Sequence, residues 1–251
     1  MIVDNLFGLI GFPLSHSFSK KYFNEKFARK GLQQTHYYDL FPLENIEAFP
    51  QLLSQHPNLV GLNVTIPYKE LVIPFLDDIS PEGQAMGAVN TIVIQRGRTT
   101  GYNTDVYGFE ISLFNKIEEA GIDPKAALIL GTGGAAKAIA FVLTKRNIAF
   151  QYVSRSSGNG DFLTYEMLTR EIIQRHPLII NTTPLGMYPK IDTLPKIPYE
   201  YLGKEHLLFD LVYNPEETAF LKKGKENNSS TLNGLEMLHL QAEKAWSIWN
   251  T

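Results

Sequence analysis

The hydrophobic and polar positions of this chain follow two spacings in turn. Residues 6–10, 36–41 and 59–66 are short apolar runs bounded by turn residues, as β-strands are. Between them, residues 18–28 and 43–53 carry apolar side chains three or four positions apart, which is the spacing of one helix face. Strands that alternate with helices are typical of an α/β fold built on a parallel sheet.

The same alternation returns in the second half of the chain. The apolar run 126–130 ends in a glycine turn, a helical segment follows to about residue 146, and a second apolar run covers 149–153. A strand, a helix and a strand in direct succession predict a βαβ unit with two parallel strands. The remaining patterns predict strands over 87–93, 177–183 and 207–213, a hairpin at 96–98, and helices over 106–120, 168–175 and 234–250.

The glycine turn of the βαβ unit indicates a dinucleotide site. In such turns the first glycine makes the tight turn, the second lets the backbone approach a pyrophosphate, and a small third residue lets the helix pack on the strand. The phosphates would lie at the helix N-terminus. The alternative is a glycine-rich turn that binds no ligand. The turn consists of Gly131, Thr132, Gly133, Gly134, Ala135 and Ala136.

The end of the next strand bears on which dinucleotide is bound. An NAD site usually has Asp or Glu about twenty residues after the glycines to bind the ribose 2′-hydroxyl, but this chain has Ser154, Arg155 and Ser156 there. A carboxylate would repel a 2′-phosphate, whereas a guanidinium and hydroxyls can donate hydrogen bonds to it. The sequence therefore favours NADP, the alternative being an exposed Arg155 without a ligand.

Ser15, His16 and Ser17 lie in the loop that follows the first strand. Loops at the carboxyl ends of strands are where α/β sheets bind ligands, although Ser15 or Ser17 can also cap the next helix without any other role. A hydrolase triad is not indicated, because adjacent Ser and His side chains rarely form a nucleophile–base pair and no Gly-x-Ser-x-Gly motif is present.

A second polar group follows the third strand. Asn63 and Thr65 share one face of that strand, and Lys69 lies in the first helical turn after it. A lone lysine in a first turn is usually solvated surface, but it meets an unfavourable helix dipole there, so a functional reason for its position is worth testing. Asp105 precedes the helix predicted over 106–120 and can cap it.

Composition narrows the function classes. With 251 residues and 44% hydrophobic content, the chain can form one large or two medium domains. Its net charge of −3, its pI near 6.1 and the lack of a long basic run argue against a nucleic-acid partner. The absence of cysteine excludes disulfides, thiolate metal sites and cysteine nucleophiles. We expect no signal peptide, no membrane span, no metal and a cytoplasmic location.

Several separated motifs, taken together, resemble those of the shikimate dehydrogenase family. Its Ser-His-Ser, Asn-Val-Thr-x-Pro-x-Lys, Gly-Ala-x-Asn-Thr and Gly-x-Asn-Thr-Asp-x-x-Gly patterns match residues 15–17, 63–69, 87–91 and 101–108. The glycine turn, an Asn-Thr-Thr-Pro-x-Gly-Met run at 181–187 and a Gly-x-x-Met-Leu-x-x-Gln pattern at 234–241 follow in order. The resemblance spans residues 8–241, nearly the whole chain.

Carried over residue by residue, the resemblance implies a catalytic pair, Lys69 and Asp105. It implies that the hydroxyls of Ser15 and Ser17 meet the substrate carboxylate. The full implied substrate set is Ser15, Ser17, Asn63, Thr65, Asn90, Tyr213 and Gln241. The implied NADP set is Gly131, Thr132, Gly133, Gly134, Ala135, Ala136, Ser154, Arg155, Thr182 and Met187, of which Thr182 and Met187 lie with Tyr213 at the nicotinamide end.

The implied reaction is the reversible, NADP-dependent reduction of 3-dehydroshikimate to shikimate in the biosynthesis of chorismate and the aromatic amino acids. Hydride addition to a ketone creates a developing alkoxide, which needs a proton donor and a positive field. A lysine that is protonated at neutral pH supplies both, and Asp105 would hold Lys69 in place. In the oxidation direction Lys69 would have to accept the proton instead.

The resemblance also implies the domain organisation. An N-terminal α/β substrate domain of residues 1–105 would be completed by a C-terminal helix, 234–251, that returns to it. Residues 106–233 would form a Rossmann domain that binds NADP. Substrate and nicotinamide would meet in a cleft between the two, so domain closure is expected. The assembly would be a monomer or a homodimer.

Two departures from the family pattern are present. Relatives commonly have Asn-Arg-Thr and a second basic residue after the second strand, whereas this chain has Ser154, Arg155 and Ser156 and no cation over 157–160, which concerns the strength of the NADP preference. The proline that usually follows the Ser-His-Ser segment is absent, with Lys20 near its place.

Three alternatives remain open at this stage. The first is a quinate/shikimate dehydrogenase that favours NAD, which an acidic residue at position 154 would have supported. The second is a ligand-sensing relative without turnover, which the loss of Lys69 or Asp105 would have indicated. The third is a different two-domain NADP enzyme, such as a methylenetetrahydrofolate dehydrogenase.

Overall fold

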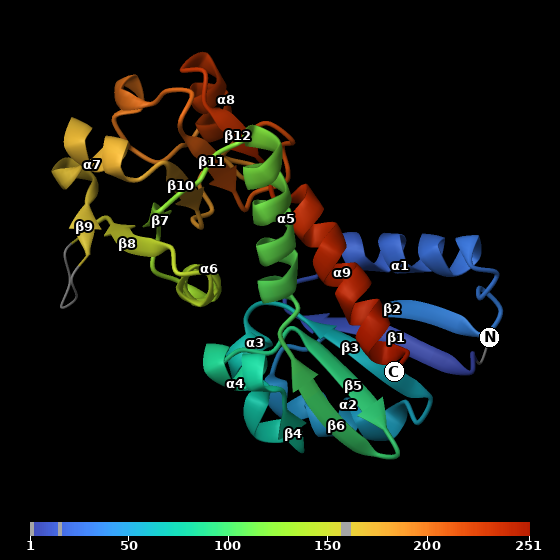
Figure 1. Cartoon of the computed structure of the whole chain (residues 1–251). Helices are drawn as coiled ribbons and strands as arrows, with labels where there is room; N and C mark the ends of the chain where they lie inside the picture. The colour runs from blue at the N-terminus through green and yellow to red at the C-terminus, as the bar shows by residue number, and fades with distance from the viewer. Residues whose placement is uncertain (1–2, 15–16, 157–161) are drawn as a thin grey trace. The chain divides into compact units, whose positions relative to one another are not determined.

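The computed structural model describes residues 3–14, 17–156 and 162–251 (Figure 1). The chain divides into two compact units. The first consists of Met1–Thr104 and Ala242–Thr251, and the second of Asp105–Gln241. Each unit contains its own six-stranded sheet, so the predicted α/β class is confirmed.

The first unit alternates strands and helices up to its third strand and ends in a hairpin. Its strands are β1 (Asn5–Gly11), β2 (His36–Pro42), β3 (Leu59–Val64), β4 (Asp78–Ile79), β5 (Thr91–Gln95) and β6 (Arg98–Tyr102). Its helices are α1 (Phe18–Arg29), η1 (Ile46–Ala48), α2 (Phe49–Gln55), α3 (Tyr68–Leu71), η2 (Ile73–Phe75) and α4 (Pro81–Met86).

The first sheet is mixed, with strand order β2-β1-β3-β5-β6-β4. Strands β2 and β3 flank β1 in parallel, while β5 runs antiparallel to β3 and to β6. Successive side chains of β1 point to opposite faces of the sheet and belong to two hydrophobic cores. Leu6 and Ile10 pack with Phe49 of α2 on one face. Phe7 and Leu9 pack on the other face with α1 and the end of the C-terminal helix. The switch in strand order between β1 and β3 positions the loops described below.

The second unit is built on a wholly parallel sheet. Its strands are β7 (Ala126–Leu130), β8 (Ala149–Ser154), β9 (Leu163–Thr164), β10 (Leu178–Asn181), β11 (Leu207–Asp210) and β12 (Ser230–Leu232). Its helices are α5 (Asp105–Ala120), α6 (Gly134–Lys145), η3 (Tyr165–Met167), α7 (Arg170–Arg175), η4 (Tyr199–Tyr201), α8 (Ala219–Glu226) and α9 (Leu235–Trp249), of which α9 continues into the first unit.

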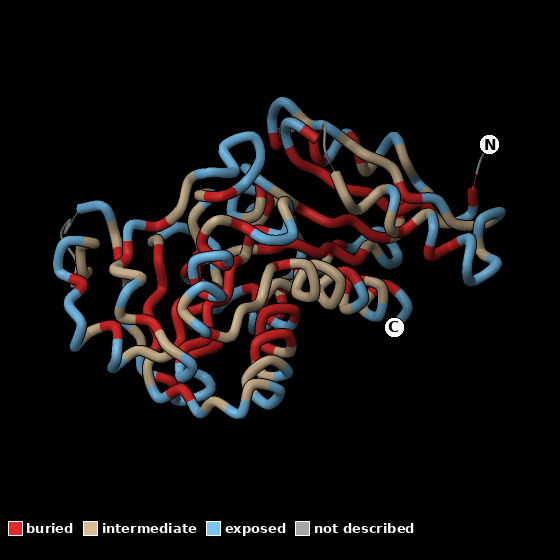
Figure 2. The backbone as a smooth tube through the Cα atoms, turned by 90° about the horizontal axis from the view of Figure 1, so that it is seen from above, coloured by how far each residue is buried: buried red, intermediate tan, exposed pale blue. Residues whose placement is uncertain are grey.

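The order of the second sheet, β12-β11-β10-β7-β8-β9, is that of a Rossmann fold. All of its strand pairs are parallel, and the direction of the strand order reverses between β7 and β10. Its inner strands β10 and β11 are buried along their whole length. Figure 2 colours such buried stretches of the chain red. Phe109 of α5 stacks on Phe209 of β11 on one face, while α7 and α8 pack on the other.

Some element boundaries differ from the sequence prediction. The helix predicted over 43–53 is a short η1 followed by α2, since Pro50 occupies the first turn of a new helix. The strand predicted from residue 87 begins at Thr91. Residue 87 instead caps the C-terminus of α4, a helix that was not predicted, and Gly87 takes the left-handed conformation there at φ +58°. Helix α8 and strand β12 were not predicted either.

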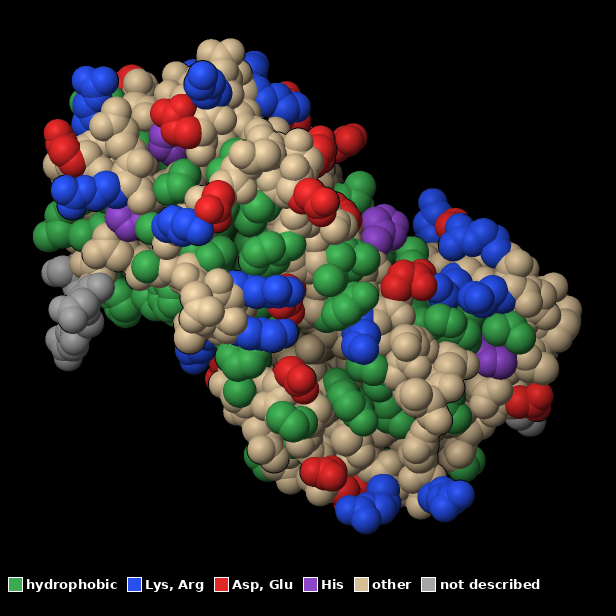
Figure 3. Space-filling model, viewed as in Figure 1, with side chains coloured by type: hydrophobic (Ala, Val, Ile, Leu, Met, Phe, Trp, Pro, Cys, Tyr) green, Lys and Arg blue, Asp and Glu red, His purple; other side chains and the backbone are tan. Residues whose placement is uncertain are grey.

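The surface carries both acidic and basic side chains (Figure 3), as the small net charge of −3 leads one to expect. On the face shown in Figure 3, acidic and basic side chains are interspersed. Among the described residues, no helix is long and apolar enough to span a bilayer.

Candidate active site

The loops after β1 and β3 lie side by side in the first unit. The amide of Thr65 donates to the carbonyl of Ile10 (2.9 Å), and the amide of Phe12 donates to the carbonyl of Ile66 (3.2 Å). Gly11 permits this approach, because a Cβ atom there would lie 2.4 Å from the Thr65 side chain. Half-buried Thr65 is thus at the switch point of the sheet, where α/β folds bind ligands.

Ser17 also lies in this region, whereas Ser15 and His16 are outside the described residues. Ser17 is the N-cap of α1, and its hydroxyl oxygen accepts a hydrogen bond from the Ser19 amide at 3.2 Å. The capping alternative is therefore realised for Ser17. A capping hydroxyl still has a hydrogen to donate, so the cap does not exclude a ligand contact.

Asn63 and Asn90 belong to one buried network of polar side chains. Asn63 Nδ2 donates to the Asn90 carbonyl and to Thr91 Oγ1, both at 3.3 Å. Asn90 Oδ1 accepts hydrogen bonds from the Thr104 amide (2.7 Å) and from the hydroxyls of Thr104 and Thr91 (both 3.2 Å). The structure thus brings two predicted substrate residues together and fixes both amide orientations.

Tyr38 of β2 joins the same network, and the sequence prediction did not include it. Its hydroxyl donates to Asn63 Oδ1 at 2.8 Å, and the side chain is fully buried. Burial raises the pKa of Tyr38 well above its ordinary value, and a hydrogen bond with Ser19 opposes that effect. The phenol is therefore neutral and acts as a hydrogen-bond donor to Asn63.

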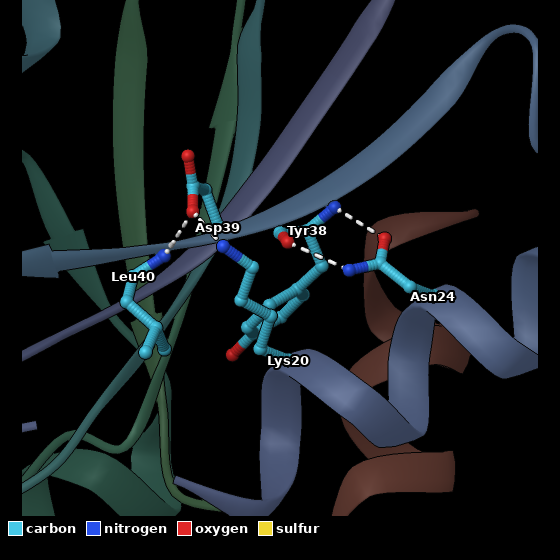
Figure 4. Close-up of polar contacts among 5 residues, drawn as sticks. All are labelled: Lys20, Asn24, Tyr38, Asp39 and Leu40. Atoms are coloured by element: carbon cyan, nitrogen blue, oxygen red, sulfur yellow. Dashed lines mark hydrogen bonds and ion pairs between the residues drawn. The ribbon is translucent and has the colours of Figure 1, made fainter. Parts of the chain in front are cut away.

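Helix α1 holds the Tyr38 backbone in place (Figure 4). Asn24 Nδ2 donates to the Tyr38 carbonyl (2.9 Å), and the Tyr38 amide donates to Asn24 Oδ1 (3.0 Å). Because β2 is an edge strand, this side chain replaces a missing strand partner. Next to it, Lys20 Nζ donates to Asp39 Oδ1 at 2.6 Å, which raises the pKa of Lys20 against the effect of burial.

The predicted catalytic residues lie at the starts of two helices. Lys69 is half-buried in α3, and its carbonyl oxygen accepts a hydrogen bond from the Val89 amide at 2.7 Å. This bond ties α3 to the segment that carries Asn90. Asp105 is the first residue of α5 and is also half-buried.

In the second unit, the glycine turn lies at the switch point between β7 and β10. Thr182 donates hydrogen bonds to the Leu130 carbonyl from its amide (3.0 Å) and its hydroxyl (2.7 Å). Gly131 has φ +111°, and a Cβ atom there would lie 2.7 Å from Thr182 Oγ1. Only glycine fits this position, because both the backbone conformation and the neighbouring hydroxyl exclude a side chain.

The N-terminus of α6 fits a dinucleotide pyrophosphate. Gly133 is the N-cap, has no side chain to satisfy the first amides, and would have nothing within 4 Å of an added Cβ atom. Thr132, Gly134 and Ala135 are exposed, while Ala136 is buried against the sheet. Open amides at the start of a twelve-residue helix form an anion site, so the residues present can hold the phosphates of NADP.

The residues predicted to select NADP follow β8. Ser154 ends the strand half-buried, and Arg155 is exposed. Burial raises the pKa of Tyr165 in η3, and the positive charge of Arg155 opposes this rise. Tyr165 is therefore within electrostatic reach of Arg155, and the sequence prediction did not include it. No local sequence pattern marks this residue of the three-residue η3.

The remaining predicted residues lie on loops and on α9 of the second unit. Met187 and Tyr213 are exposed on the loops after β10 and β11. Gln241 is half-buried on α9, where its Nε2 donates to the Leu238 carbonyl at 3.0 Å. Gly108 of α5 lies against this part of α9, because a Cβ atom there would lie 2.5 Å from the Met237 carbonyl oxygen.

Two further features lie apart from these residues. A hollow of about 940 Å³ lies on the first unit against the β5–β6 hairpin, and it is lined by none of the predicted site residues. Within the described ranges, no three His, Asp or Glu side chains are grouped to hold a metal ion.

Comparison with known proteins shows which family this chain is similar to. Residues 9–92 match the family model of the shikimate dehydrogenase substrate binding domain. A shikimate dehydrogenase (NADP(+)) of Clostridium beijerinckii is 44% identical over 97% of this chain and 91% of its own length.

Solved structures of the same kind match both units. A Thermus thermophilus shikimate 5-dehydrogenase in complex with NADP(H) and shikimate is 31% identical, with TM-score 0.79 over 98% of this chain and 93% of that one. A Corynebacterium glutamicum quinate dehydrogenase in complex with NAD is 27% identical, with TM-score 0.84 over 99% and 94%. The resemblance found in the motifs is therefore confirmed: this chain belongs to the shikimate dehydrogenase family.

Proposed function

We propose that this chain is an NADP-dependent shikimate dehydrogenase that reversibly reduces 3-dehydroshikimate to shikimate. The observation that carries the proposal is the 44% identity, over nearly the full length, to a relative named for this activity and cofactor. The motifs that carry Lys69, Asp105 and Arg155 lie within the matched length. This activity belongs to the biosynthesis of chorismate and the aromatic amino acids.

When bound, NADPH would supply the hydride for the ketone carbon of the substrate. In our proposal, Lys69 Nζ donates a proton to the ketone oxygen as negative charge develops on it. The Asp105 carboxylate would hold the ammonium group in position and keep it charged. In the reverse direction Lys69 accepts the proton of the shikimate hydroxyl.

We assign the substrate to the polar side chains around the loops after β1 and β3: Ser15, Ser17, Asn63, Thr65 and Asn90, with Tyr213 and Gln241 from the second unit. Asn63 Oδ1 accepts one hydrogen bond from Tyr38 and has a second lone pair for a substrate hydroxyl. Asn90 Nδ2 donates to none of the described groups, so it can donate to the substrate. The network in which both amides lie would orient these groups before substrate binds.

We assign the cofactor to the second unit. The open amides at the start of α6 would bind the pyrophosphate, and Gly131 would allow its close approach. Arg155 and Ser154 would bind the 2′-phosphate by charge-assisted hydrogen bonds. Thr182 and Met187 would lie at the nicotinamide end.

The domain roles follow from these assignments. Residues 1–105 with 234–251 would form the substrate domain, and 106–233 the NADP domain. A cytoplasmic location and a monomeric or homodimeric state complete the proposal.

The proposal is tested by following NADPH or NADH absorbance with four pairs: NADP⁺ or NAD⁺ with shikimate or quinate. We expect turnover with shikimate and NADP⁺ at a kcat/KM above that of the other pairs. The quinate and NAD⁺ arms test the second candidate, which the likeness to the quinate dehydrogenase favours. Highest kcat/KM with quinate and NAD⁺ would establish that candidate, and no turnover by folded protein would favour a sensing role.

A further inference from the structure

A buried carboxylate at the carboxyl end of β11 has no role in the proposed mechanism. Asp210 has no exposed surface, and neither does Asn181, its neighbour at the end of β10. The two residues are paired in the parallel register of these strands. They lie next to the switch point at which Thr182 contacts Leu130.

Three hydrogen-bond donors converge on the Asp210 carboxylate. Asn181 Nδ2 and the Val212 amide donate to Oδ1, each at 3.0 Å. The Thr218 hydroxyl donates to Oδ2 at 2.6 Å. No Lys or Arg of the described residues pairs with this carboxylate, so the hydrogen bonds alone satisfy it.

Asn181 extends the network into the loop after β10. Its Oδ1 accepts hydrogen bonds from the Thr183 amide (3.1 Å) and hydroxyl (2.6 Å). Thr183 Oγ1 in turn accepts one from the Leu185 amide at 3.3 Å. The start of the segment 182–187 is therefore hydrogen-bonded to the Asn181 side chain, which is itself hydrogen-bonded to Asp210.

Val212 and Thr218 extend the network into the loop after β11. Thr218 is the N-cap of α8, and its Oγ1 also accepts from the Leu221 amide at 3.3 Å. Gly186 lies close to Thr218, since a Cβ atom at Gly186 would lie 3.2 Å from Thr218 Cβ. The two loops thus meet at Thr218, which donates to Asp210 directly, and at Gly186, which follows Leu185. The Leu185 carbonyl accepts a hydrogen bond from Asn181 Nδ2 at 3.4 Å.

A buried unpaired charge is costly for folding, so its presence calls for a purpose other than stability. An ionised carboxylate accepts from all three donors, whereas an amide at the same position would direct an N–H group at one of them. The charge therefore keeps the two loops in one arrangement.

We propose that Asp210 is a positioning residue for hydride transfer: its carboxylate fixes the segments 182–187 and 211–215, which carry Thr182, Met187 and Tyr213. This inference rests on the proposed function, since those three residues are assigned to the nicotinamide end. Asp210 itself touches neither cofactor nor substrate in this account. It acts through Asn181 and Val212.

Titration of Asp210 gives the inference a measurable signature. Burial raises the pKa of Asp210 to about 6, against the hydrogen bonds from Thr218, Val212 and Asn181. Among the described residues, Tyr199 of η4 is a titratable group that the Asp210 charge affects: burial, Tyr165 and Asp210 all raise the pKa of Tyr199. Strands β10, β11 and β12 carry no other charged side chain. The charged side chains of α8 and of residues 188–192 and 216–217 are exposed to solvent.

The first experiment uses the protein without cofactor. The amide NMR signals of Thr183, Leu185 and Val212 are followed from pH 5 to pH 8 in the wild type, in Asp210→Asn and in Asp192→Asn, an exposed control. We expect the three signals to shift with one midpoint near pH 6 in the wild type and the control, and not in Asp210→Asn. Signals that do not titrate in the wild type would overturn the inference.

The second experiment measures reduction of 3-dehydroshikimate over the same pH range. We expect the kcat of the wild type to decrease at pH values below the same midpoint. In Asp210→Asn, we expect kcat to be about 10²-fold lower, because displaced reacting groups react more slowly, and to lose this pH dependence. Affinity for 2′,5′-ADP, which lacks nicotinamide, would stay unchanged. If Asp210→Asn had the same kcat as the wild type and the same decrease in kcat at low pH, the inference would be overturned. If the wild type showed no turnover, that result would count against the proposed function alone.

A second pair of variants covers the case in which Asp210→Asn does not fold. Thr218→Val removes one donor from the carboxylate, and Thr218→Ser keeps it. We expect the NMR midpoint to move to higher pH in Thr218→Val and to stay in Thr218→Ser, because a lost donor disfavours the charged form. Equal midpoints in both variants would contradict the network as described.

Discussion

At the scale of single residues, the orientation of Asn63 depends on a hydroxyl from another strand. Tyr38 donates to Asn63 Oδ1 from within the core, where its ring stacks on Phe23 at 4.7 Å between centroids. The same amide is held on its nitrogen side by the Asn90 carbonyl and Thr91. Substrate recognition in this family member is therefore predicted to depend on a residue that does not touch substrate.

Tyr38→Phe tests this dependence. Removing the hydroxyl leaves a buried acceptor with one donor fewer, which costs about 1–3 kcal/mol of the free energy of unfolding. We expect urea denaturation to show this loss, and the KM for shikimate to rise while the KM for NADP⁺ does not. Tyr37→Phe is the matched control, because Tyr37 is 39% exposed. An unchanged KM for shikimate in folded Tyr38→Phe would contradict the role of Tyr38.

Arg155→Ala tests the cofactor preference. A charge-assisted hydrogen bond is worth about 1.5–3 kcal/mol, so we expect the KM for NADP⁺ to rise about 10- to 100-fold. The KM for NAD⁺, which has no 2′-phosphate, serves as the internal control and should not change. Equal effects on both cofactors would mean that Arg155 does not bind the 2′-phosphate.

At the scale of elements, helices α5 and α6 are joined by one buried carboxylate. Glu110 of α5 accepts hydrogen bonds from Lys145 Nζ (3.0 Å) and from Arg146 Nε (2.6 Å). Its side chain is only 9% exposed, and Arg146 also lies 4.6 Å above the Phe114 ring. Burial raises the pKa of Glu110, but the two cations outweigh it and the pKa is lowered.

Glu110→Gln should therefore destabilise the protein in a pH-dependent way. Because the folded-state pKa lies below the unfolded one, the carboxylate stabilises the fold above the unfolded pKa and loses this effect as the pH falls through the folded pKa. We expect a loss of about 1–3 kcal/mol in unfolding free energy near pH 7 that shrinks below about pH 4. Urea denaturation at several pH values measures it, with exposed Glu118→Gln as control. A loss that is independent of pH would contradict the ion pairs.

The elements that sequence predicted well are those with a regular apolar pattern and a defined end. Strand β7 was predicted with the observed bounds, and the end of β8 and the end of α6 within one residue, since glycine and a change of spacing mark these limits. The start of α6 was predicted too late, because the helix begins at Gly134, inside the glycine turn. Helix α4 was not predicted, because its six residues contain one half-buried Met86 and no apolar stripe. Short elements of this kind are fixed by tertiary contacts rather than by local pattern.

The same limit applies to the sites. Motif spacing was sufficient to propose Asn63, Thr65 and Gly131, which the fold brings to switch points of the two sheets. It could not identify Tyr38 or Asp210, because each acts through a hydrogen bond between strands that only the sheet register brings together. Such partners need the topology as well as the sequence.

At the scale of the whole molecule, the chain forms two units with separate cores. Both tryptophans, Trp246 and Trp249, lie in the part of α9 that belongs to the first unit. Chains of two such units commonly depart from two-state unfolding. Tryptophan fluorescence should therefore report the first unit alone.

This arrangement makes a prediction for denaturant titrations. We expect Tyr38→Phe to shift the fluorescence transition, and Glu110→Gln to leave it in place while shifting part of the circular dichroism transition. The wild type and Glu118→Gln give the reference curves. Identical shifts of both signals in both variants would indicate that the two units unfold as one.

The central claim is that Lys69 is the proton donor of a shikimate dehydrogenase. The measurement is kcat for reduction of 3-dehydroshikimate by NADPH in the wild type, in Lys69→Ala and in Lys125→Ala, whose side chain is 82% exposed. General acids contribute about 10²–10⁴-fold, so we expect Lys69→Ala to lose at least 10² in kcat with NADP⁺ affinity and the control unchanged. A kcat for Lys69→Ala within about tenfold of the wild type would contradict the account.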